Sequence, residues 1–416
     1  MKNLLITITL IAALSACNDK YTETYRANVP EYMSLEAWRA MEIGVEGPRN
    51  LSESGKIYIY QNYLFIVERG AGIHIVNNSN PSAPQNLAFL NIPGSVDLAV
   101  RNNTLYVDSY YDLLSFNIND PANPTLSCRI TNAFDFDNWT LVKGYDEDLP
   151  FTGIDPNRGV ITGWSQQEII QDAQQPSQSG FENSLSEVGI STGMNVSSGI
   201  GGSMAQFTLT GSFLYVLRPA SITAFDLSAN DCPNQSSLTP VSWNAETIFP
   251  YNNHLFIGTS NGMLIYNLND PAQPEYVSQI QHATACDPVV VQDDRAYITI
   301  RTGSSCQGWL NQLQVIDISS YSSPQRIAEY NLTNPHGLGI DGNTLFVCDG
   351  NAGLKVYNAE DDLAIADNII AHYENITTFD VIPYNNVLIM SAEEGIYQYD
   401  YTDPQSIVQL SFIPAY

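Results

Sequence analysis

Lysine and arginine are scarce in this 416-residue sequence. There are 16 of them against 44 aspartates and glutamates, which gives a formal net charge of −28, and only 14% of all residues are charged. A nucleic-acid-binding protein needs clustered basic side chains to displace the counterions of the phosphate backbone. The sequence has no such cluster, so we exclude nucleic acid as a partner. An apolar content of 44% also argues against a disordered chain.

Several short motifs that carry chemistry are missing as well. No Cys-x-x-Cys pair is present, so a zinc-ribbon or thioredoxin-like site has no support. The glycine-rich stretch 199–202 is not followed by Lys-Ser or Lys-Thr, so it does not match a phosphate-binding loop. The acidic residues between Asp135 and Asp148 lack the regular spacing of a calcium-binding loop.

The N-terminus has the features of an export signal. Lys2 precedes a mostly apolar run from Leu4 to Leu14, which is too short to span a bilayer as a permanent helix. The run ends in Leu14-Ser15-Ala16-Cys17, which resembles the lipobox of bacterial lipoproteins. The resemblance implies a signal peptide over residues 1–17, acylation of Cys17 by chains such as palmitate, and attachment to the outer membrane on its periplasmic or surface face. The alternative is an ordinary signal peptide with a chance cysteine.

Export would place the other five cysteines in an oxidising compartment. Cys286 and Cys306 flank a predicted hairpin, which brings its two ends together as a disulfide requires. We therefore predict a Cys286–Cys306 disulfide, with two separate buried thiols as the alternative. Five is an odd number, so at least one cysteine is unpaired within the chain. The sequence leaves open the pairing of the remaining three, Cys128, Cys232 and Cys348.

A short strand pattern recurs along the chain. Between His254 and Ile280, three apolar runs at strand spacing are separated by two turns. In each unit of this kind, an apolar pair begins the second strand. The seven pairs are Leu64-Phe65, Leu105-Tyr106, Leu214-Tyr215, Leu255-Phe256, Ala296-Tyr297, Leu345-Phe346 and Leu388-Ile389. They are separated by 41, 109, 41, 41, 49 and 43 residues, which with four strands per unit predicts an all-β fold, the β-propeller.

Seven apolar pairs predict seven blades in one domain over residues 55–416. The 109-residue step contains an insertion at about 131–202, whose middle is rich in Gln, Ser, Gly and Asn. Residues 159–164 within this insertion have a strand pattern, so an eighth blade remains open.

Residues 18–54 are expected to form a tether and packing segment before the propeller. The sequence is irregular there as far as about residue 50. One short helix is predicted between Tyr32 and Met41, with Ser34 as its cap.

The third-strand phrases Leu313–Ser319 and Ile73–Asn78 resemble the LVIVD repeat. The chain is similar to the LVIVD-repeat lipoproteins of Bacteroidota-like bacteria over residues 55–416. The phrases at 285–291 and 334–342 are the most particular part of the resemblance. It implies a propeller fold and a cell-envelope location, and it implies no reaction and no catalytic residues.

A propeller brings two strand ends of every blade to the mouth of its central channel. The first strand lines the channel and the second runs antiparallel to it, so the start of one and the end of the other reach the same face. The candidate ligand-binding residues at this mouth are Glu68, Asp97, Asp108, Arg218, Asp287, Arg301, His336, Asp349 and Asp380. Such a set predicts a site for a polyol, a sugar or a divalent metal. The alternative is that strand ends are polar because water satisfies their backbone groups.

Three function hypotheses follow. The first is a non-enzymatic binding or scaffolding protein of the envelope, held on the membrane by its N-terminal lipid, with a protein or glycan partner and no cofactor. The second is a propeller hydrolase or lyase with a metal or histidine at the channel mouth. Because one histidine without a placed partner is not an acid–base system, we name no catalytic residue. The third is an accessory lipoprotein subunit of an outer-membrane complex, with the 131–202 insertion as its docking arm.

Overall fold

The structure is a computed structural model that describes residues 22–134, 144–146, 148–172, 199–228, 232–242, 245–281, 288–301 and 310–416. The chain divides into two compact units. The first comprises Met1–Ala40 and Val142–Glu182, and the second comprises Met41–Leu141 and Asn183–Tyr416. Within the described ranges, no helix has both the length and the apolar character needed to cross a membrane.

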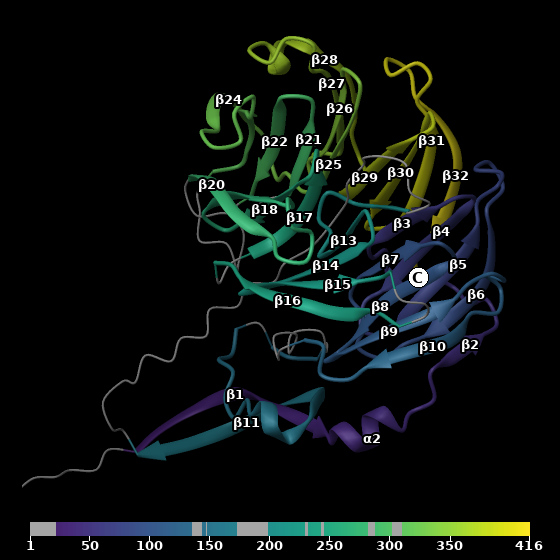
Figure 1. Ribbon diagram of the computed structural model, residues 1–416, viewed down its shortest axis with the longest axis vertical. Helices are drawn as coiled ribbons and strands as arrows, with labels where there is room; N and C mark the ends of the chain where they lie inside the picture. The colour runs from purple at the N-terminus through teal and green to yellow at the C-terminus, as the bar shows by residue number, and fades with distance from the viewer. Residues whose placement is uncertain are drawn as a thin grey trace, which may run out of the picture. The chain divides into compact units, whose positions relative to one another are not determined.

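The first unit is built on a two-stranded antiparallel ribbon. Its strands β1 (Thr22–Met33) and β11 (Val160–Asp172) lie side by side in Figure 1. Helix α2 (Leu35–Arg39) follows β1, and the Ser34 side chain caps it by accepting a hydrogen bond from the Ala37 N–H. The predicted helix is thereby confirmed. The prediction of an irregular segment is wrong for β1, because its pairing partner lies far along the chain.

Asn28 fixes a loop of the first unit against the ribbon. The residue is fully buried, and its Nδ2 donates to the carbonyl oxygens of Asp146 and Leu149 at 2.8 and 2.9 Å. Trp164 packs edge-on against Phe151, with ring centroids 4.8 Å apart. The short 3₁₀ turn η3 (Pro156–Arg158) leads into β11. The strand predicted over residues 159–164 therefore belongs largely to β11 and does not form an eighth blade.

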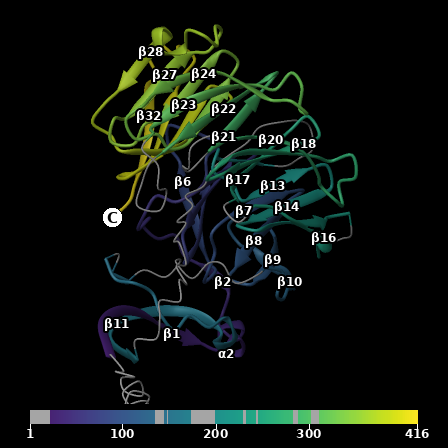
Figure 2. The same cartoon turned by 90° about the vertical axis from the view of Figure 1, so that its left-hand side faces the viewer.

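The second unit is a β-propeller of seven four-stranded antiparallel blades, as the sequence predicts; Figures 1 and 2 show the blades in succession. We name the strands of each blade A to D in chain order. Blade 1 comprises β3 (Ile57–Tyr60), β4 (Tyr63–Glu68), β5 (Gly72–Asn77) and β6 (Gln85–Asn91). Blade 2 comprises β7 (Leu98–Arg101), β8 (Thr104–Ser109), β9 (Asp112–Asn117) and β10 (Thr125–Ile130). Blade 3 comprises β13 (Phe207–Thr210), β14 (Phe213–Arg218), β15 (Ser221–Asp226) and β16 (Asn234–Pro240).

The remaining four blades follow without a long interruption. Blade 4 comprises β17 (Ala245–Tyr251), β18 (His254–Thr259), β19 (Gly262–Asn267) and β20 (Glu275–Gln281). Blade 5 comprises β21 (Val289–Gln292), β22 (Arg295–Ile300), β23 (Gln312–Asp317) and β24 (Gln325–Asn331). Blade 6 comprises β25 (Leu338–Asp341), β26 (Thr344–Cys348), β27 (Leu354–Asn358), the 3₁₀ turn η4 (Ile365–Asn368) and β28 (Ile369–Tyr373). Blade 7 comprises β29 (Thr378–Tyr384), β30 (Val387–Ala392), β31 (Gly395–Asp400) and β32 (Val408–Pro414).

Blade 1 carries two additional strands. β2 (Gly44–Glu46) pairs with β6 on its outer edge, and β12 (Ile200–Gly201) pairs with β3 on its inner edge. The tight A–B turns have the geometry that their sequence predicts. Asn102 and Asn103 have φ angles of 49° and 59°, which is the type I′ arrangement whose twist suits a hairpin.

Every blade has a β-bulge at the same place in its strand D. The ladder between strands C and D shifts by one residue in all seven blades. The extra residues, in blade order, are Leu87, Ser127, Ser236, Val277, Ile327, Ile370 and Leu410. Five are apolar and partly buried, whereas Ser127 and Ser236 in blades 2 and 3 are exposed. Bulges twist an edge strand and so hinder its pairing with other chains.

The start of the propeller segment, at Leu51, meets the C-terminal residues where blade 7 joins blade 1, a junction that we call the closure seam. Its apolar cluster contains Leu51, Ile57, Ile66, Ile382, Ile389 and Ile396. Leu51 bridges to Ala415, and the Tyr416 N–H donates to the Leu51 carbonyl at 2.9 Å. The side-chain amides of Asn78 and Gln398 donate to each other, both at 2.8 Å. These described contacts of the closure seam all join uncharged groups.

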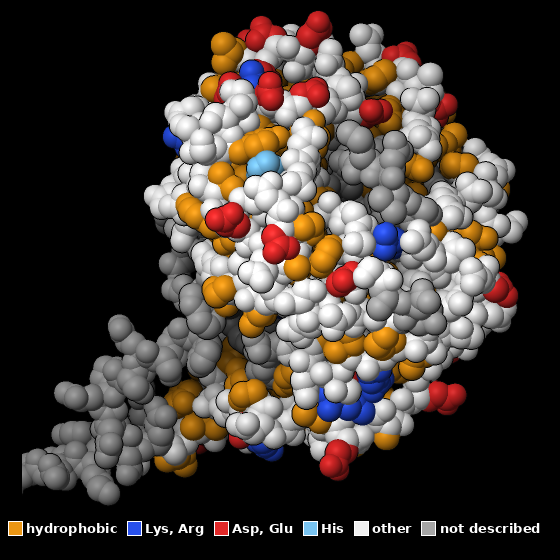
Figure 3. Space-filling view, in the orientation of Figure 1, with side chains coloured by type: hydrophobic (Ala, Val, Ile, Leu, Met, Phe, Trp, Pro, Cys, Tyr) orange, Lys and Arg blue, Asp and Glu red, His pale blue; other side chains and the backbone are white. Residues whose placement is uncertain are grey.

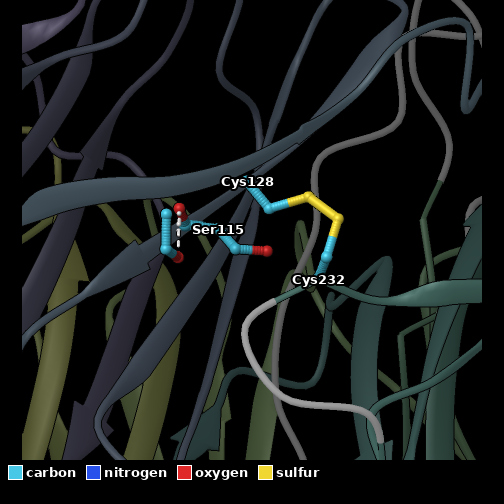
Figure 4. The surroundings of a disulfide bond; sticks show 4 residues. Ser115, Cys128 and Cys232 are labelled. Atoms are coloured by element: carbon cyan, nitrogen blue, oxygen red, sulfur yellow. Dashed lines mark hydrogen bonds between the residues drawn. A yellow bond between two sulfur atoms is a disulfide. The ribbon is translucent and has the colours of Figure 1, made fainter.

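The chain leaves the ring between blades 2 and 3, and we call this junction the insertion seam. Phe134 packs against Phe207 and Phe225, with ring centroids 6.2 and 6.1 Å away. A disulfide joins Cys128 of β10 to Cys232 just before β16, with Cα atoms 5.3 Å apart (Figure 4).

The Cys128–Cys232 bridge resolves part of the pairing that the sequence left open. Cys348, the remaining cysteine of that set, is a buried free thiol. The predicted Cys286–Cys306 disulfide lies outside the described residues.

Candidate functional site

Residues 199–206 lie at the centre of the ring, and we call them the axial segment. Ile200 and Gly201 pair with β3 of blade 1, and the Gly199 N–H donates to Val100 of blade 2 at 2.9 Å. The Ala205 carbonyl accepts from Ile248 of blade 4 at 2.8 Å.

Ser203 extends the contacts of the axial segment to two further blades. Its Oγ donates to Asp380 of blade 7 at 3.2 Å and accepts from the Leu338 N–H of blade 6 at 2.9 Å. Only a segment on the axis can contact five of the seven blades within eight residues. The glycines of the segment permit this position, because a Cβ on Gly199 or Gly201 would overlap the Tyr58 ring.

Asp97 and Lys56 form an ion pair beside the axial segment. The Lys56 Nζ lies 3.0 Å from Asp97 Oδ2. The same carboxylate accepts hydrogen bonds from the backbone N–H groups of Gln206 and Phe207 at 2.7 and 3.0 Å. Burial lowers the pKa of Lys56 to about 8, against the opposing effect of Asp97. The pair thus ties the starts of blades 1 and 2 to the beginning of blade 3.

Asp108 and Arg218 form a second buried pair across the insertion seam. The Arg218 Nη2 donates to Asp108 Oδ2 at 3.0 Å, and both residues are at most 3% exposed. Asp108 Oδ1 also accepts from the Val96 and Asp97 N–H groups at 2.7 and 3.1 Å. The guanidinium lies 4.3 Å from the centre of the Phe134 ring. Burial raises the pKa of Asp108, although Arg218 acts in the opposite direction.

Asp380 is the third buried carboxylate of this axial cluster. Burial raises its pKa to about 8, while hydrogen bonds from Val381 and Ser203 and the charge of Lys56 act against the shift. This shift favours the protonated form of the carboxyl group near neutral pH. It holds the axial segment to blade 7 through Ser203.

A second group of predicted residues lies around blade 6. The Arg301 Nη1 and the Asn334 Nδ2 both lie 3.3 Å from His336 Nε2. Both are donors, so Nε2 acts as the acceptor of a neutral imidazole. Asp349 accepts from the Thr333 and Asn334 N–H groups and pairs with Lys355 at 2.5 Å. This carboxylate fixes the loop before strand A, as Asp108 does in blade 2.

Glu68 belongs to a third group, in blade 1. Its carboxylate binds Arg49 at 2.7 Å and His74 Nε2 at 2.9 Å. Burial would raise the pKa of Glu68, but hydrogen bonds from His74 and Ser52 and the charge of Arg49 lower it overall. Burial lowers the pKa of His74. Sequence reasoning missed His74 as a site residue, although a histidine within the apolar strand Gly72–Asn77 was a usable signal.

A nucleophile-elbow motif was also overlooked in the sequence. Residues 258–262 have the Gly-x-Ser-x-Gly pattern, with Ser260 at its centre. The motif requires a sharp turn from a strand into a helix. Here the residues form the hairpin turn from β18 to β19, where the Thr259 Oγ1 donates to the Gly262 carbonyl at 2.8 Å. The structural context of a serine hydrolase is therefore not met at this position.

The structure divides the predicted mouth residues among these groups. Four of them, Asp97, Asp108, Arg218 and Asp380, come together with Lys56 around the axial segment. Arg301 and His336 lie near each other at blade 6. Asp349 pairs with Lys355, and Glu68 pairs with Arg49 and His74. Asp287 lies outside the described residues. Within the described part of the chain, no three His, Cys, Asp or Glu side chains are grouped so that they could hold a metal ion.

Comparisons with known proteins agree with this fold. Two segments of the chain match the LVIVD repeat. They comprise residues 53–89 and 307–332, and they include the strand-C phrases Ile73–Asn78 and Leu313–Ser319. The phrases at 285–291 and 334–342 lie outside both segments. No curated protein matches the chain.

Solved structures with the same fold are distant in sequence. Sqt1 of Saccharomyces cerevisiae matches with a TM-score of 0.52 and 9% identity, over 90% of this chain and 89% of that one. The computationally designed protein Ika8 matches with a TM-score of 0.50 and 7% identity, over 88% of this chain and 90% of that one. A functionally unknown protein from Desulfotomaculum acetoxidans matches with a TM-score of 0.50 and 10% identity, over 85% of this chain and 95% of that one. At these identities the likeness concerns the fold alone.

Proposed function

We propose that this protein is a non-enzymatic binding or scaffolding protein of the cell envelope. A lipid on Cys17 would anchor it, as in the lipoproteins of Bacteroidota-like bacteria that its sequence resembles. The binding platform is the axial face, by which we mean the face that carries the B–C turns and the connections from strand D to strand A.

The observation that carries the proposal is how the axial ionisable groups are used. Asp97, Asp108 and Asp380 are each at most 4% exposed, and they bind backbone N–H groups, cations or the axial segment of the same chain. Such groups hold blades in fixed positions, and their own hydrogen-bonding capacity is largely used internally. A rigid ring with short turns on its surface suits recognition of a partner better than proton transfer.

The surface chemistry is consistent with a binding role. In Figure 3, acidic side chains are distributed over several separate parts of the visible face, and lysine and arginine are sparse. Seven lysines and arginines of the propeller unit form ion pairs with carboxylates of the same unit. A partner of the face shown in Figure 3 therefore meets mainly neutral and acidic groups.

The proposed location rests on two independent features. The Leu14–Cys17 pattern resembles a lipid-attachment site, and a disulfide joins Cys128 to Cys232. Disulfides form and persist chiefly outside the reducing cytosol. The test of the anchor is a Cys17→Ala variant, which should lose metabolic labelling by an alkynyl palmitate and should leave the membrane fraction. Unchanged labelling would contradict acylation at Cys17.

The division into two units favours a second candidate, the accessory subunit of an envelope complex. The first unit combines the segment that follows the proposed anchor with part of the insertion. An arm of this kind suits docking onto another subunit while the propeller stays free.

One experiment separates the two candidates. A photo-cross-linking amino acid is placed in intact cells at one of three exposed positions: Glu393 in the B–C turn of blade 7, Glu360 on the opposite face, or Gln167 in β11. Adducts formed only from position 393 support binding at the axial face. Adducts formed only from position 167 support the accessory subunit. Equal adducts at 393 and 360, or none at 393, would contradict the axial platform.

A further inference from the structure

The Cys128–Cys232 disulfide is accessible to solvent. Cys232 is exposed and Cys128 is half-buried, in contrast to the fully buried thiol of Cys348. Figure 4 shows the bridge spanning from β10 to the segment before β16, so it connects the outer parts of blades 2 and 3. A thiol reagent in solution can therefore reach the bridge without prior unfolding.

The bridge stands where a short covalent link is missing. Blade 4 passes to blade 5 between Gln281 and Val289, whereas blade 2 passes to blade 3 between Ile130 and Phe207. A long connection restrains its two ends much less than a short one. The disulfide joins cysteines that are 104 residues apart in the sequence, and it restores a direct covalent connection between two neighbouring blades.

The packing around the bridge is also different from that in the other blades. In five blades the bulge residue of strand D is a partly buried apolar side chain. In blades 2 and 3 the bulge residues are Ser127 and Ser236, which are exposed. The Ser127 Oγ donates back to the Ser115 carbonyl of its own blade at 3.0 Å. Apolar contact at the bulge of strand D is therefore weaker in blades 2 and 3, and the disulfide connects these two blades there.

We propose that Cys128–Cys232 is a site of thiol–disulfide exchange at which a dithiol releases the outer part of blade 3 from blade 2. A thiolate of the dithiol attacks the Sγ of the exposed residue Cys232, and Cys128 leaves as a thiolate that takes up a proton. The second thiol of the reagent then displaces Cys232. The products are two cysteine thiols and the oxidised, cyclic dithiol. Asp108, Arg218 and Phe134 keep the inner part of the insertion seam in place.

The test is hydrogen–deuterium exchange of the folded chain with and without dithiothreitol. A Cys17→Ser/Cys286→Ser/Cys306→Ser background removes the three cysteines outside the described residues. On reduction, amides of β10 and β16 should exchange at least about tenfold faster, because a covalent restraint on local opening is lost. Amides of β3 and β32 at the closure seam should be unchanged. A Cys128→Ser/Cys232→Ser variant should show the fast exchange without reductant and no further response to it.

Cys348 provides an internal control for the extent of opening. After reduction, iodoacetamide should alkylate Cys128 and Cys232 and leave the buried Cys348 thiol unmodified. Alkylation of all three would show that the whole propeller opens, which overturns a seam-specific site. Unchanged exchange in β10 and β16 after complete reduction would show that the bridge restrains nothing, which also overturns the proposal.

Discussion

The closure seam joins blades 7 and 1 with aliphatic side chains and a neutral amide pair, whereas the insertion seam joins blades 2 and 3 with a buried ion pair, a phenylalanine and a disulfide. Apolar contacts respond little to pH, salt or redox state, because no group in them ionises or reacts. The buried ion pair responds to pH, because its groups ionise. The exposed disulfide responds to redox conditions, because thiols can reduce it. The ring therefore has one junction that is insensitive to its surroundings and one that is sensitive.

The largest expected effect comes from removing the cation of the insertion seam. Arg218→Met leaves Asp108 as a buried carboxylate without its partner, which should lower the free energy of unfolding by about 3 to 5 kcal/mol. Denaturant unfolding measures the change. Arg326→Met is the matched control, because that arginine is 41% exposed and its pair with Glu329 should contribute about 0.5 kcal/mol or less. Equal losses in the two variants would show that the Asp108–Arg218 pair does not hold the seam.

A comparable loss is expected from an apolar truncation at the closure seam. Ile389 is 1% exposed within the Ile382–Ile396 cluster, so Ile389→Ala should cost roughly 3 kcal/mol through lost burial and a cavity. Unlike the Arg218→Met effect, this loss should be the same at pH 6 and pH 9. Unfolding curves for both variants at the two pH values make the comparison. A pH-dependent loss in Ile389→Ala would remove the distinction between the seams.

The buried ionisable groups beside the axial segment should make the stability of the propeller depend on pH. The pKa of Asp380 is about 8 in the folded state against an ordinary value of 3.8, so between these values the folded state binds the additional proton. Stability should therefore fall as pH rises from about 5 to 8, by at most about 1.4 kcal/mol per pH unit. The pKa of Lys56 is about 8 against 10.5, so the unfolded state binds the additional proton above pH 8 and stability should recover towards pH 10.

Two variants separate the falling part of the stability–pH profile from its rising part. Asp380→Asn should flatten the fall between pH 5 and 8, and Lys56→Met should flatten the rise above pH 8. Thermal unfolding across the pH range gives the curve. A wild-type profile that is flat from pH 5 to 10 would contradict the assignment of both groups.

The sequence predicts the ring of blades well because each blade is local. Asn102-Asn103 and Asn385-Asn386 sit between alternating apolar runs, and such turns set hairpin register without distant contacts. The regular spacing of the strand-B pairs then gives seven units. Propeller topology also placed Asp97, Asp108 and Asp380 near the axis, where the structure has them.

The sequence does not predict contacts between residues that are far apart along the chain. Ser203 and Asp380 are separated by 177 positions, and no local pattern indicates that residues 199–206 enter the centre of the ring. The same applies to the Cys128–Cys232 bridge, because spacing alone does not choose among pairings. Burial and pairing of the mouth carboxylates follow from these contacts, so sequence reasoning gave their position and not their role.

The smallest expected effect tests whether the neutral pair of the closure seam is specific. Gln398→Ala alone should cost about 1 to 2 kcal/mol, because Asn78 loses both hydrogen bonds next to a fully buried position. Replacing both residues with leucine should cost less than the single variant, since no polar group then lacks a partner. A double-mutant cycle should give a coupling of about 1 kcal/mol that does not change with salt or pH. A coupling that weakens with salt would mean that charge contributes to the closure seam, and the contrast with the insertion seam would then be one of degree.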